Sequence, residues 1–288
     1  MTIGQRLFIL LQHCLPKRLI GRCVYHAVRW RFAPLKNWLI LRFVRHYDID
    51  MSEAAESNPR AYPTFNAFFT RSLNPGARPI DSDESQVIAP ADGTLTQWGS
   101  LEGGRIIQAK GLDYSADALL GEARPAHVKL TDPSYATIYL APYDYHRVHI
   151  PMAGRLRGMN YIPGECYAVN ATTAQGIPNL FPRNERIVCW FTGQRGDFAV
   201  VLVGAFNVAT MSTVWAGEVQ ARGQSRYWSY DAQELVFAKA DEIGHFNLGS
   251  TVVMVCSGAL RWLPSLHSGM PTRMGMTLAR SANVRTAG

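Results

Sequence analysis

A glycine and a serine stand together where an apolar run begins, in the segment 248–256 (LGSTVVMVC). Glycine tolerates backbone geometries that other residues cannot adopt, and it leaves its own carbonyl group unshielded by a side chain. The hydroxyl of Ser250 beside such a carbonyl can attack it and convert the Gly249–Ser250 amide into an ester, the first step of self-cleavage. Most Gly-Ser pairs before a strand are ordinary turns, so this motif needs support from elsewhere in the chain.

Two further stretches offer side chains that would activate a serine. Asp92 lies in the segment 90–94 (PADGT), and His146 and His149 lie in the segment 143–151 (YDYHRVHIP). A carboxylate can fix the tautomer of an imidazole, and that imidazole can take the proton of a hydroxyl. Asp92, His149 and the serine therefore form a candidate set of orienting acid, general base and nucleophile.

Each of these features also has an ordinary explanation. Asp-Gly pairs are common in turns, and a lone histidine is usually a structural residue. His146 and His149 are three residues apart, which places them on opposite faces of a regular strand but on one face of a helical turn. Pro142 and Pro151 bracket the segment and limit regular structure. Local geometry therefore leaves open whether both histidines reach one site.

In their order and separation these motifs resemble the phosphatidylserine decarboxylase family of the bacterial, membrane-associated type, whose members are proenzymes that acquire a pyruvoyl group. The resemblance covers nearly the whole chain and includes the segments 107–111 (IQAKG), 179–186 (NLFPRNER) and 213–217 (TVWAG). The chain has no Walker sequence and no G-x-G-x-x-G after a strand, so no nucleotide cofactor is indicated. A cofactor built from the chain itself agrees with that pattern.

The resemblance implies a reaction scheme. His149, oriented by Asp92, would activate Ser250 to attack the carbonyl of Gly249, and elimination with loss of ammonia would leave a pyruvoyl group at residue 250. A large chain (1–249) and a small chain (250–288) would result. The pyruvoyl group would form a Schiff base with phosphatidylserine and act as the electron sink for its decarboxylation to phosphatidylethanolamine. His146 would lie on the substrate side, near the departing carboxylate or as a proton donor.

Two other classes of function stay open at this point. A membrane-associated serine hydrolase could use Asp92, His149 and Ser250 without self-cleavage, although no G-x-S-x-G elbow is present. A β-sandwich without catalytic activity, in which all three motifs are turns, is the other alternative. A metal site is not predicted, because His146 and His149 have no third ligand at a suitable spacing.

The positive charge of the chain is concentrated at its start. Residues 1–47 contain nine basic and no acidic residues, whereas the other 241 residues carry 20 basic and 22 acidic side chains. Apolar clusters alternate with these cations, and no run approaches the roughly 20 apolar residues that span a bilayer. We expect two or three amphipathic helices that lie on an anionic membrane surface. A basic arm packed on the body or bound to nucleic acid is the alternative, but the aromatic and aliphatic content argues against nucleic acid.

The rest of the chain is expected to form a connector and a β-rich catalytic domain. Residues 48–85 are the connector, with a short helix in 61–69 capped near Thr64. Over 86–288 short apolar runs, such as 206–214, recur between Gly, Pro and Asp signals, which predicts antiparallel sheets in a barrel or sandwich, ending in a mobile tail after about residue 278. Hydrophobic residues make up 47% of the chain, enough for a substantial core. The predicted fold class is α+β, a mostly antiparallel β body with N-terminal amphipathic helices.

The five cysteines are odd in number and scattered, with no C-x-x-C pair, which fits a reducing compartment better than a disulfide framework. Together with the basic arm this predicts a peripheral protein at the cytoplasmic face of the cell membrane. The resemblance also admits a homodimer of the processed pair of chains.

Overall fold

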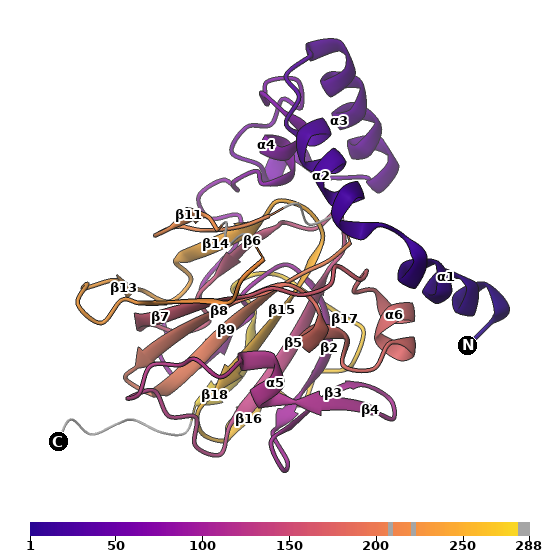
Figure 1. Cartoon of the computed structure of the whole chain (residues 1–288). Helices are drawn as coiled ribbons and strands as arrows, with labels where there is room; N and C mark the ends of the chain where they lie inside the picture. The colour runs from indigo at the N-terminus through magenta and orange to yellow at the C-terminus, as the bar shows by residue number, and fades with distance from the viewer. Residues whose placement is uncertain (207–209, 220–222, 282–288) are drawn as a thin grey trace.

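Three helices form the start of the chain and project from a β-rich body (Figure 1). The computed structural model describes residues 1–206, 210–219 and 223–281. The helices are α1 (Ile3–Cys14), α2 (Lys17–Val28) and α3 (Ala33–Tyr47), as the alternation of apolar and basic residues predicts. In the part of the chain that is described, no helix is both long and apolar enough to cross a bilayer.

The connector packs against α3 and carries a short helix. It contains the 3-10 turn η1 (Met51–Glu53) and the helix α4 (Phe65–Phe69). The hydroxyl of Thr64 accepts a hydrogen bond from the amide of Ala67 at 3.0 Å, which confirms the predicted helix and its cap. A small apolar cluster around the fully buried Ile40 joins α3 to this segment.

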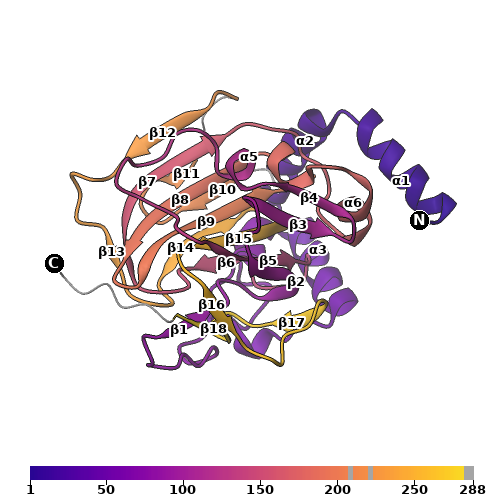
Figure 2. The same cartoon turned by 90° about the horizontal axis from the view of Figure 1, so that it is seen from below.

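Nine strands form one antiparallel sheet that runs through the body (Figure 2). Eight of them follow the order β12-β7-β8-β9-β15-β5-β2-β17, and β13 pairs with the first residues of β7. Their bounds are β2 (Gly93–Ser100), β5 (Ser134–Leu140), β7 (Gly154–Ile162), β8 (Arg186–Gly193), β9 (Gly196–Gly204), β12 (Arg226–Ser229), β13 (Val236–Phe237), β15 (Ser250–Cys256) and β17 (Met270–Thr272).

Smaller sheets and short helices cover the two faces of this sheet. One sheet has the order β1-β18-β16, another has the order β11-β10-β14-β6, and β3 pairs with β4 in a hairpin. The bounds are β1 (Gln86–Ile88), β3 (Arg105–Ala109), β4 (Leu112–Ser115), β6 (Arg147–His149), β10 (Met211–Thr213), β11 (Gly217–Glu218), β14 (Glu242–Phe246), β16 (Leu260–Trp262), β18 (Thr277–Ser281), α5 (Ala116–Leu120), α6 (Ala171–Gly176) and α7 (Leu180–Arg183).

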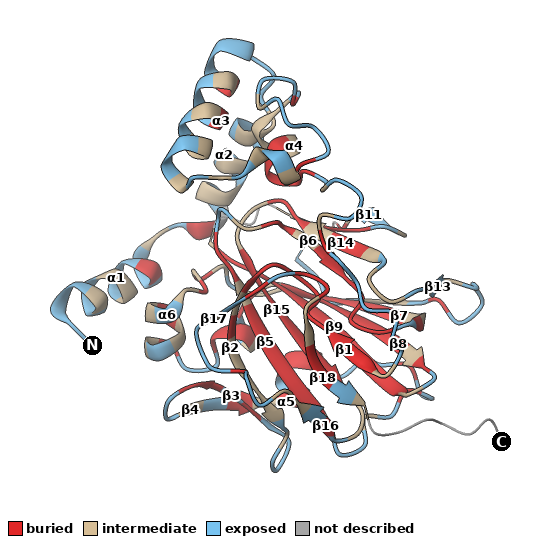
Figure 3. Cartoon of the chain, turned by 180° about the vertical axis from the view of Figure 1, so that it is seen from behind, coloured by how far each residue is buried: buried red, intermediate tan, exposed pale blue. Residues whose placement is uncertain are grey.

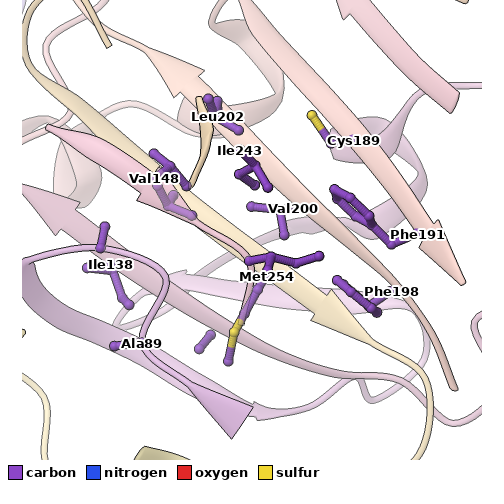
Figure 4. Close-up of a cluster of buried hydrophobic side chains, with 14 of the residues drawn as sticks. Ala89, Ile138, Val148, Cys189, Phe191, Phe198, Val200, Leu202, Ile243 and Met254 are labelled. Carbon is purple, nitrogen blue, oxygen red and sulfur yellow. The ribbon is translucent and has the colours of Figure 1, made fainter. Parts of the chain in front are cut away.

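Successive side chains of β15 point alternately into two apolar cores, one on each face of the large sheet. Val252 and Met254 lie in the core between the large sheet and the two smaller sheets, part of which Figure 4 shows. Val253 and Val255 lie in a second core, on the opposite face, beneath the β3–β4 hairpin and the short helices. Figure 3 shows that burial is concentrated in these strands, whereas the N-terminal helices are largely exposed or half-buried.

These layers confirm the predicted α+β class with antiparallel, sandwich-like sheets, and the described strands do not close into a barrel. Of the apolar run 206–214, the structure contains β10, while residues 207–209 lie outside the described residues. The tail that was expected to be mobile is described only as far as residue 281.

Gly93, directly after Asp92, is required by close packing. Its φ is +155°, and a Cβ there would lie 2.3 Å from the carbonyl oxygen of Tyr139. Gly99 has a φ of +151°, but the atom nearest to a Cβ there would be a ring carbon of Tyr135 at 4.0 Å.

We predict that Gly93→Ala lowers the free energy of unfolding by about 3 kcal/mol and Gly99→Ala by about 1 kcal/mol. Both changes strain the backbone, but only the first also makes the new Cβ overlap with a neighbouring atom. Urea unfolding measures both, and equal losses would contradict this explanation.

Candidate active site

Ser250 is the first residue of β15 and lies in the middle of the large sheet. Its backbone is paired with Leu140 of β5 on one side and with Gly204 of β9 on the other. The residue is fully buried, and its Oγ has no hydrogen-bond partner among the described residues. Because Ser250 alternates in step with Val252 and Met254, its side chain belongs to the face that carries β6 and β14. A buried hydroxyl without a partner is costly in a folded protein and therefore requires an explanation.

A cavity of about 580 Å³ lies at the start of β15. Gly249 and Ser250 form part of its wall, and a Cβ on Gly249 would meet open space. The φ of Gly249 is not in the left-handed region, so the backbone shows no strain at this angle. The N-terminal helices and the connector supply nearly half of the apolar wall: Phe8, Leu11, Leu15, Phe43, Tyr47, Phe65 and Phe69.

The chain just before Gly249 is fixed by the connector and by β6. The amide of Phe246 donates to the carbonyl of His146 at 3.0 Å. The side-chain amide of Asn66, in α4, donates to Oδ1 of Asn247 at 3.0 Å, and Nδ2 of Asn247 donates to Thr210. The segment 61–69 was interpreted from the sequence as packing only. In the structure it also positions the residues beside the Gly249–Ser250 bond.

His146 is fully buried and lies one ring away from the cavity. Its ring is 4.0 Å from that of Phe69 between centroids, and Phe69 lines the cavity. Nδ1 lies 2.8 Å from the carbonyl oxygen of Asp144, and because a carbonyl only accepts, Nδ1 carries the proton. Nε2 is buried without a partner among the described residues. Burial lowers the pKa of His146 to about 3, so the imidazole is neutral at neutral pH.

His149 lies in β6, on the face opposite to Val148, which packs in the core. Its Nδ1 donates to the carbonyl of Ala240 at 2.7 Å, so Nε2 is the accepting nitrogen, and the hydroxyl of Tyr145 lies 3.0 Å from it. Burial lowers the pKa of His149, which keeps it neutral and able to take a proton. Its backbone amide donates to the carbonyl of Pro90 at 2.8 Å, which brings the 90–94 segment against this histidine.

Asp92 is held by donors other than the histidines. Nε and Nη2 of Arg78 lie 3.1 and 2.5 Å from its two carboxylate oxygens, and the amide of Met274 donates to Oδ1 at 2.8 Å. Within the described residues, no hydrogen bond joins Asp92 to His149 or His149 to Ser250. A triad would require the imidazole of His149 to turn and to leave the hydroxyl of Tyr145. The assignment of Asp92, His149 and Ser250 therefore stays a prediction.

Two charged residues near His146 were missed by the sequence analysis. Arg71 is buried, and its guanidinium lies 5.3 Å from the ring of Phe68 and has one long hydrogen bond, 3.4 Å, to the carbonyl of Tyr143. Burial lowers the pKa of Arg71. Burial also raises the pKa of Asp144 to about 6. The motif 143–151 includes Asp144, but no sequence signal pointed to Arg71.

Comparison with known proteins identifies the class of enzyme. A family model described as phosphatidylserine decarboxylase matches residues 65–280, and a second model, described as PSD, matches residues 7–48. A phosphatidylserine decarboxylase proenzyme of Chromobacterium violaceum is 45% identical over 281 residues, which cover 96% of this chain and 100% of that protein. One of Bordetella avium is 46% identical over 286 residues, or 98% of this chain and 97% of its own length.

These matches define the chain as a decarboxylase. It belongs to the phosphatidylserine decarboxylase family, and the resemblance seen in the sequence is confirmed.

The pKa shifts of His146 and Asp144 predict opposite effects of acid on stability. Folded His146 binds fewer protons than an unfolded histidine between pH 6.5 and about 3, so it contributes stability that is lost as pH falls. Folded Asp144 binds more protons than an unfolded aspartate between about pH 6 and 3.8, so it contributes stability that is gained as pH falls.

Variants of these two residues separate the effects. On acidification from pH 6.5 to 4.5, we predict that His146→Asn loses less stability than the parent and Asp144→Asn loses more, each by about 1 kcal/mol per pH unit. Asparagine at 146 retains an amide donor for the carbonyl of Asp144. Urea unfolding across this pH range, in a Ser250→Ala parent, gives the measurement. Changes of the same sign in both variants would disprove the assigned shifts.

Proposed function

We propose that the chain decarboxylates phosphatidylserine to phosphatidylethanolamine through a pyruvoyl group made from Ser250 after cleavage of the Gly249–Ser250 bond. The observation that carries the proposal is the position of the Ser250 hydroxyl, which is buried, has no hydrogen-bond partner among the described residues, and lies beside the open side of Gly249. The relatives' name, proenzyme, supports a chain that is processed before it acts.

The cleavage uses only groups of the chain and water. The Ser250 oxygen bonds to the carbonyl carbon of Gly249 as the C–N bond breaks, and the hydroxyl proton passes to His149, while the released amine takes up a proton. Loss of the Cα proton then breaks the Cβ–O bond of the ester and frees the carboxylate of Gly249. Water converts the resulting dehydroalanine to a ketone and releases ammonia. Burial lowers the pKa of His149, so the imidazole is neutral before the step and has a lone pair that can take this proton.

The surroundings of Ser250 fit a carbonyl group at residue 250. Replacing the hydroxyl removes a buried donor that has no acceptor among the described residues. Such a group supplies a carbonyl that takes up the amine of the substrate and withdraws electrons from the bond to its carboxylate. β5 and β9 hold residues 250–256 from both sides, so the new chain end stays in place after cleavage. His146 is assigned to the substrate side, where its unprotonated Nε2, beside Phe69, can accept a hydrogen bond.

The N-terminal helices are proposed to dock on the cytoplasmic face of an anionic membrane. Exposed apolar side chains support this, among them Leu7, Leu10, Trp30 and Trp38, with exposed fractions between 56% and 64%. The segment carries basic and no acidic residues, so an anionic surface attracts it. Because α1 and α3 also line the cavity, a lipid held at the surface lies close to Ser250.

A serine hydrolase acting on intact chains is less well supported. Such an enzyme presents its nucleophile on an exposed turn with the base hydrogen-bonded to it. Ser250 is fully buried in a central strand, and Nε2 of His149 is hydrogen-bonded to Tyr145.

Cleavage is tested by intact mass after denaturation. Wild-type protein is expected to give chains 1–249 and 250–288, the second lighter by one ammonia than a peptide that begins with serine. Ser250→Ala should give one uncut chain, because it lacks the nucleophile. Ser257→Ala, directly after the far end of the same strand, should be cut like the wild type. A single uncut mass from active wild-type protein would exclude the proposal and favour the hydrolase.

Membrane docking is tested by co-sedimentation with vesicles of phosphatidylglycerol and phosphatidylcholine. We expect Leu7→Glu together with Leu10→Glu to weaken binding at least about tenfold, because each change removes apolar burial and adds negative charge. Val236→Glu is the matched control, since Val236 is 64% exposed, like Leu7, but lies in β13 of the body. Equal binding by the double variant and the control would argue against docking through this segment.

A further inference from the structure

The carboxylate of Asp92 is fixed by a fork of two donors from Arg78. Nε and Nη2 of Arg78 bind separate oxygens at 3.1 and 2.5 Å, a geometry that sets both the distance and the plane of the carboxylate. Exposed fractions of 9% for Arg78 and 7% for Asp92 put the pair out of solvent. Oδ1 of Asp92 also accepts from the amide of Met274. In this pair the arginine, and not a histidine, determines where the negative charge lies.

Arg78 is itself held by its other donors. Nη2 also lies 2.9 Å from the carboxylate of Glu53, and Nη1 donates to the carbonyl of Ala77 at 2.9 Å. Burial alone would lower the pKa of Arg78, but the hydrogen bonds of Asp92 and Glu53 outweigh burial and raise it. Glu53 further binds Arg273 at 2.8 Å. The guanidinium is therefore charged and has no freedom to turn away from Asp92.

The place of Asp92 matters because it follows Pro90 by two residues, and the carbonyl of Pro90 accepts from the backbone amide of His149 at 2.8 Å. Burial lowers the pKa of His149, and the hydrogen bond to the carbonyl of Ala240 and the negative charges of Glu242 and, to a smaller extent, Asp92 oppose that shift. When His149 takes a proton it becomes a cation in a buried site, and a nearby fixed anion stabilises it. Without a hydrogen bond between the two side chains, this stabilisation depends on the residue that holds the carboxylate.

We propose that Arg78 is a positioning residue for self-cleavage, which fixes the carboxylate of Asp92 beside His149. The inference rests on the proposed function above. The residues that hold Asp92 and Arg78 come from both products of cleavage: Arg78 and Glu53 lie in the large chain, whereas Met274, which donates to Asp92, and Arg273, which pairs with Glu53, lie in the small chain. The small chain thus supplies part of the support of Asp92 and remains joined to the connector after the bond is cut.

The test compares Arg78→Met with Arg78→Lys, which have similar length and differ in charge. We expect Arg78→Met to slow the appearance of the two chains at least about tenfold, and Arg78→Lys to slow it only about threefold, because lysine keeps the cation but not the fork. Arg157→Gln, which removes a part-buried arginine that pairs with Asp231 elsewhere in the body, should be cut at the wild-type rate. Cell-free synthesis followed by gel analysis over time gives the rates.

Stability is measured separately, by thermal unfolding of each variant in a Ser250→Ala background that cannot be cut. Equal cleavage rates for Arg78→Met and Arg78→Lys would overturn the inference, because they would leave only a packing role. If Arg78→Met fails to fold, the Arg78→Lys variant decides. Cleavage at the wild-type rate would refute the positioning role of the two-donor contact, whereas slower cleavage at an unchanged unfolding midpoint would support it. A wild-type chain that stays uncut would refute the proposed function instead.

Discussion

The site depends on the pairing of one backbone position with two strands. Ser250 is joined to Leu140 on one side and to Gly204 on the other, while Gly249 lies just outside the ladder. This boundary keeps the serine fixed and places Gly249 in the wall of an open cavity. The strands that follow residue 250 pair with β1, β2, β5 and β9, all of which precede it. The bond at 249–250 can therefore break without separating the two parts of the fold.

The cavity at this boundary joins the helices of the first 47 residues to the chemistry of the body. Residues of α1, α3 and α4 form part of its apolar wall, and Ser250, the proposed reacting position, lies in the sheet. An amphiphilic substrate suits such a wall, since under the proposed function its chains would stay in the lipid while its head group reaches the strand. Around the site, burial keeps both His146 and His149 neutral, so neither requires deprotonation before it accepts a proton.

Local patterns in the sequence predicted the elements that local forces determine. The alternation of basic and apolar residues predicted the N-terminal helices, the cap at Thr64 predicted α4, and the β-branched run predicted β15. Contacts between distant residues were not predictable, because composition carries no information about which segments meet. The amide of Met274 reaches Asp92 across 182 residues, and the hydroxyl of Tyr145 occupies the nitrogen of His149 that a base would use. The motifs identified which residues matter, but not what holds them.

The location of the reactive carbonyl tests the central claim most directly. Active enzyme would be incubated with an alkoxyamine probe, which condenses with ketones, and the intact mass of each chain would then be measured. The account predicts one probe on the chain that begins at residue 250, none on the chain of residues 1–249, and a loss of activity in proportion to labelling. Active enzyme that takes up no probe at residue 250, or takes it up elsewhere, would contradict the origin of the carbonyl in Ser250.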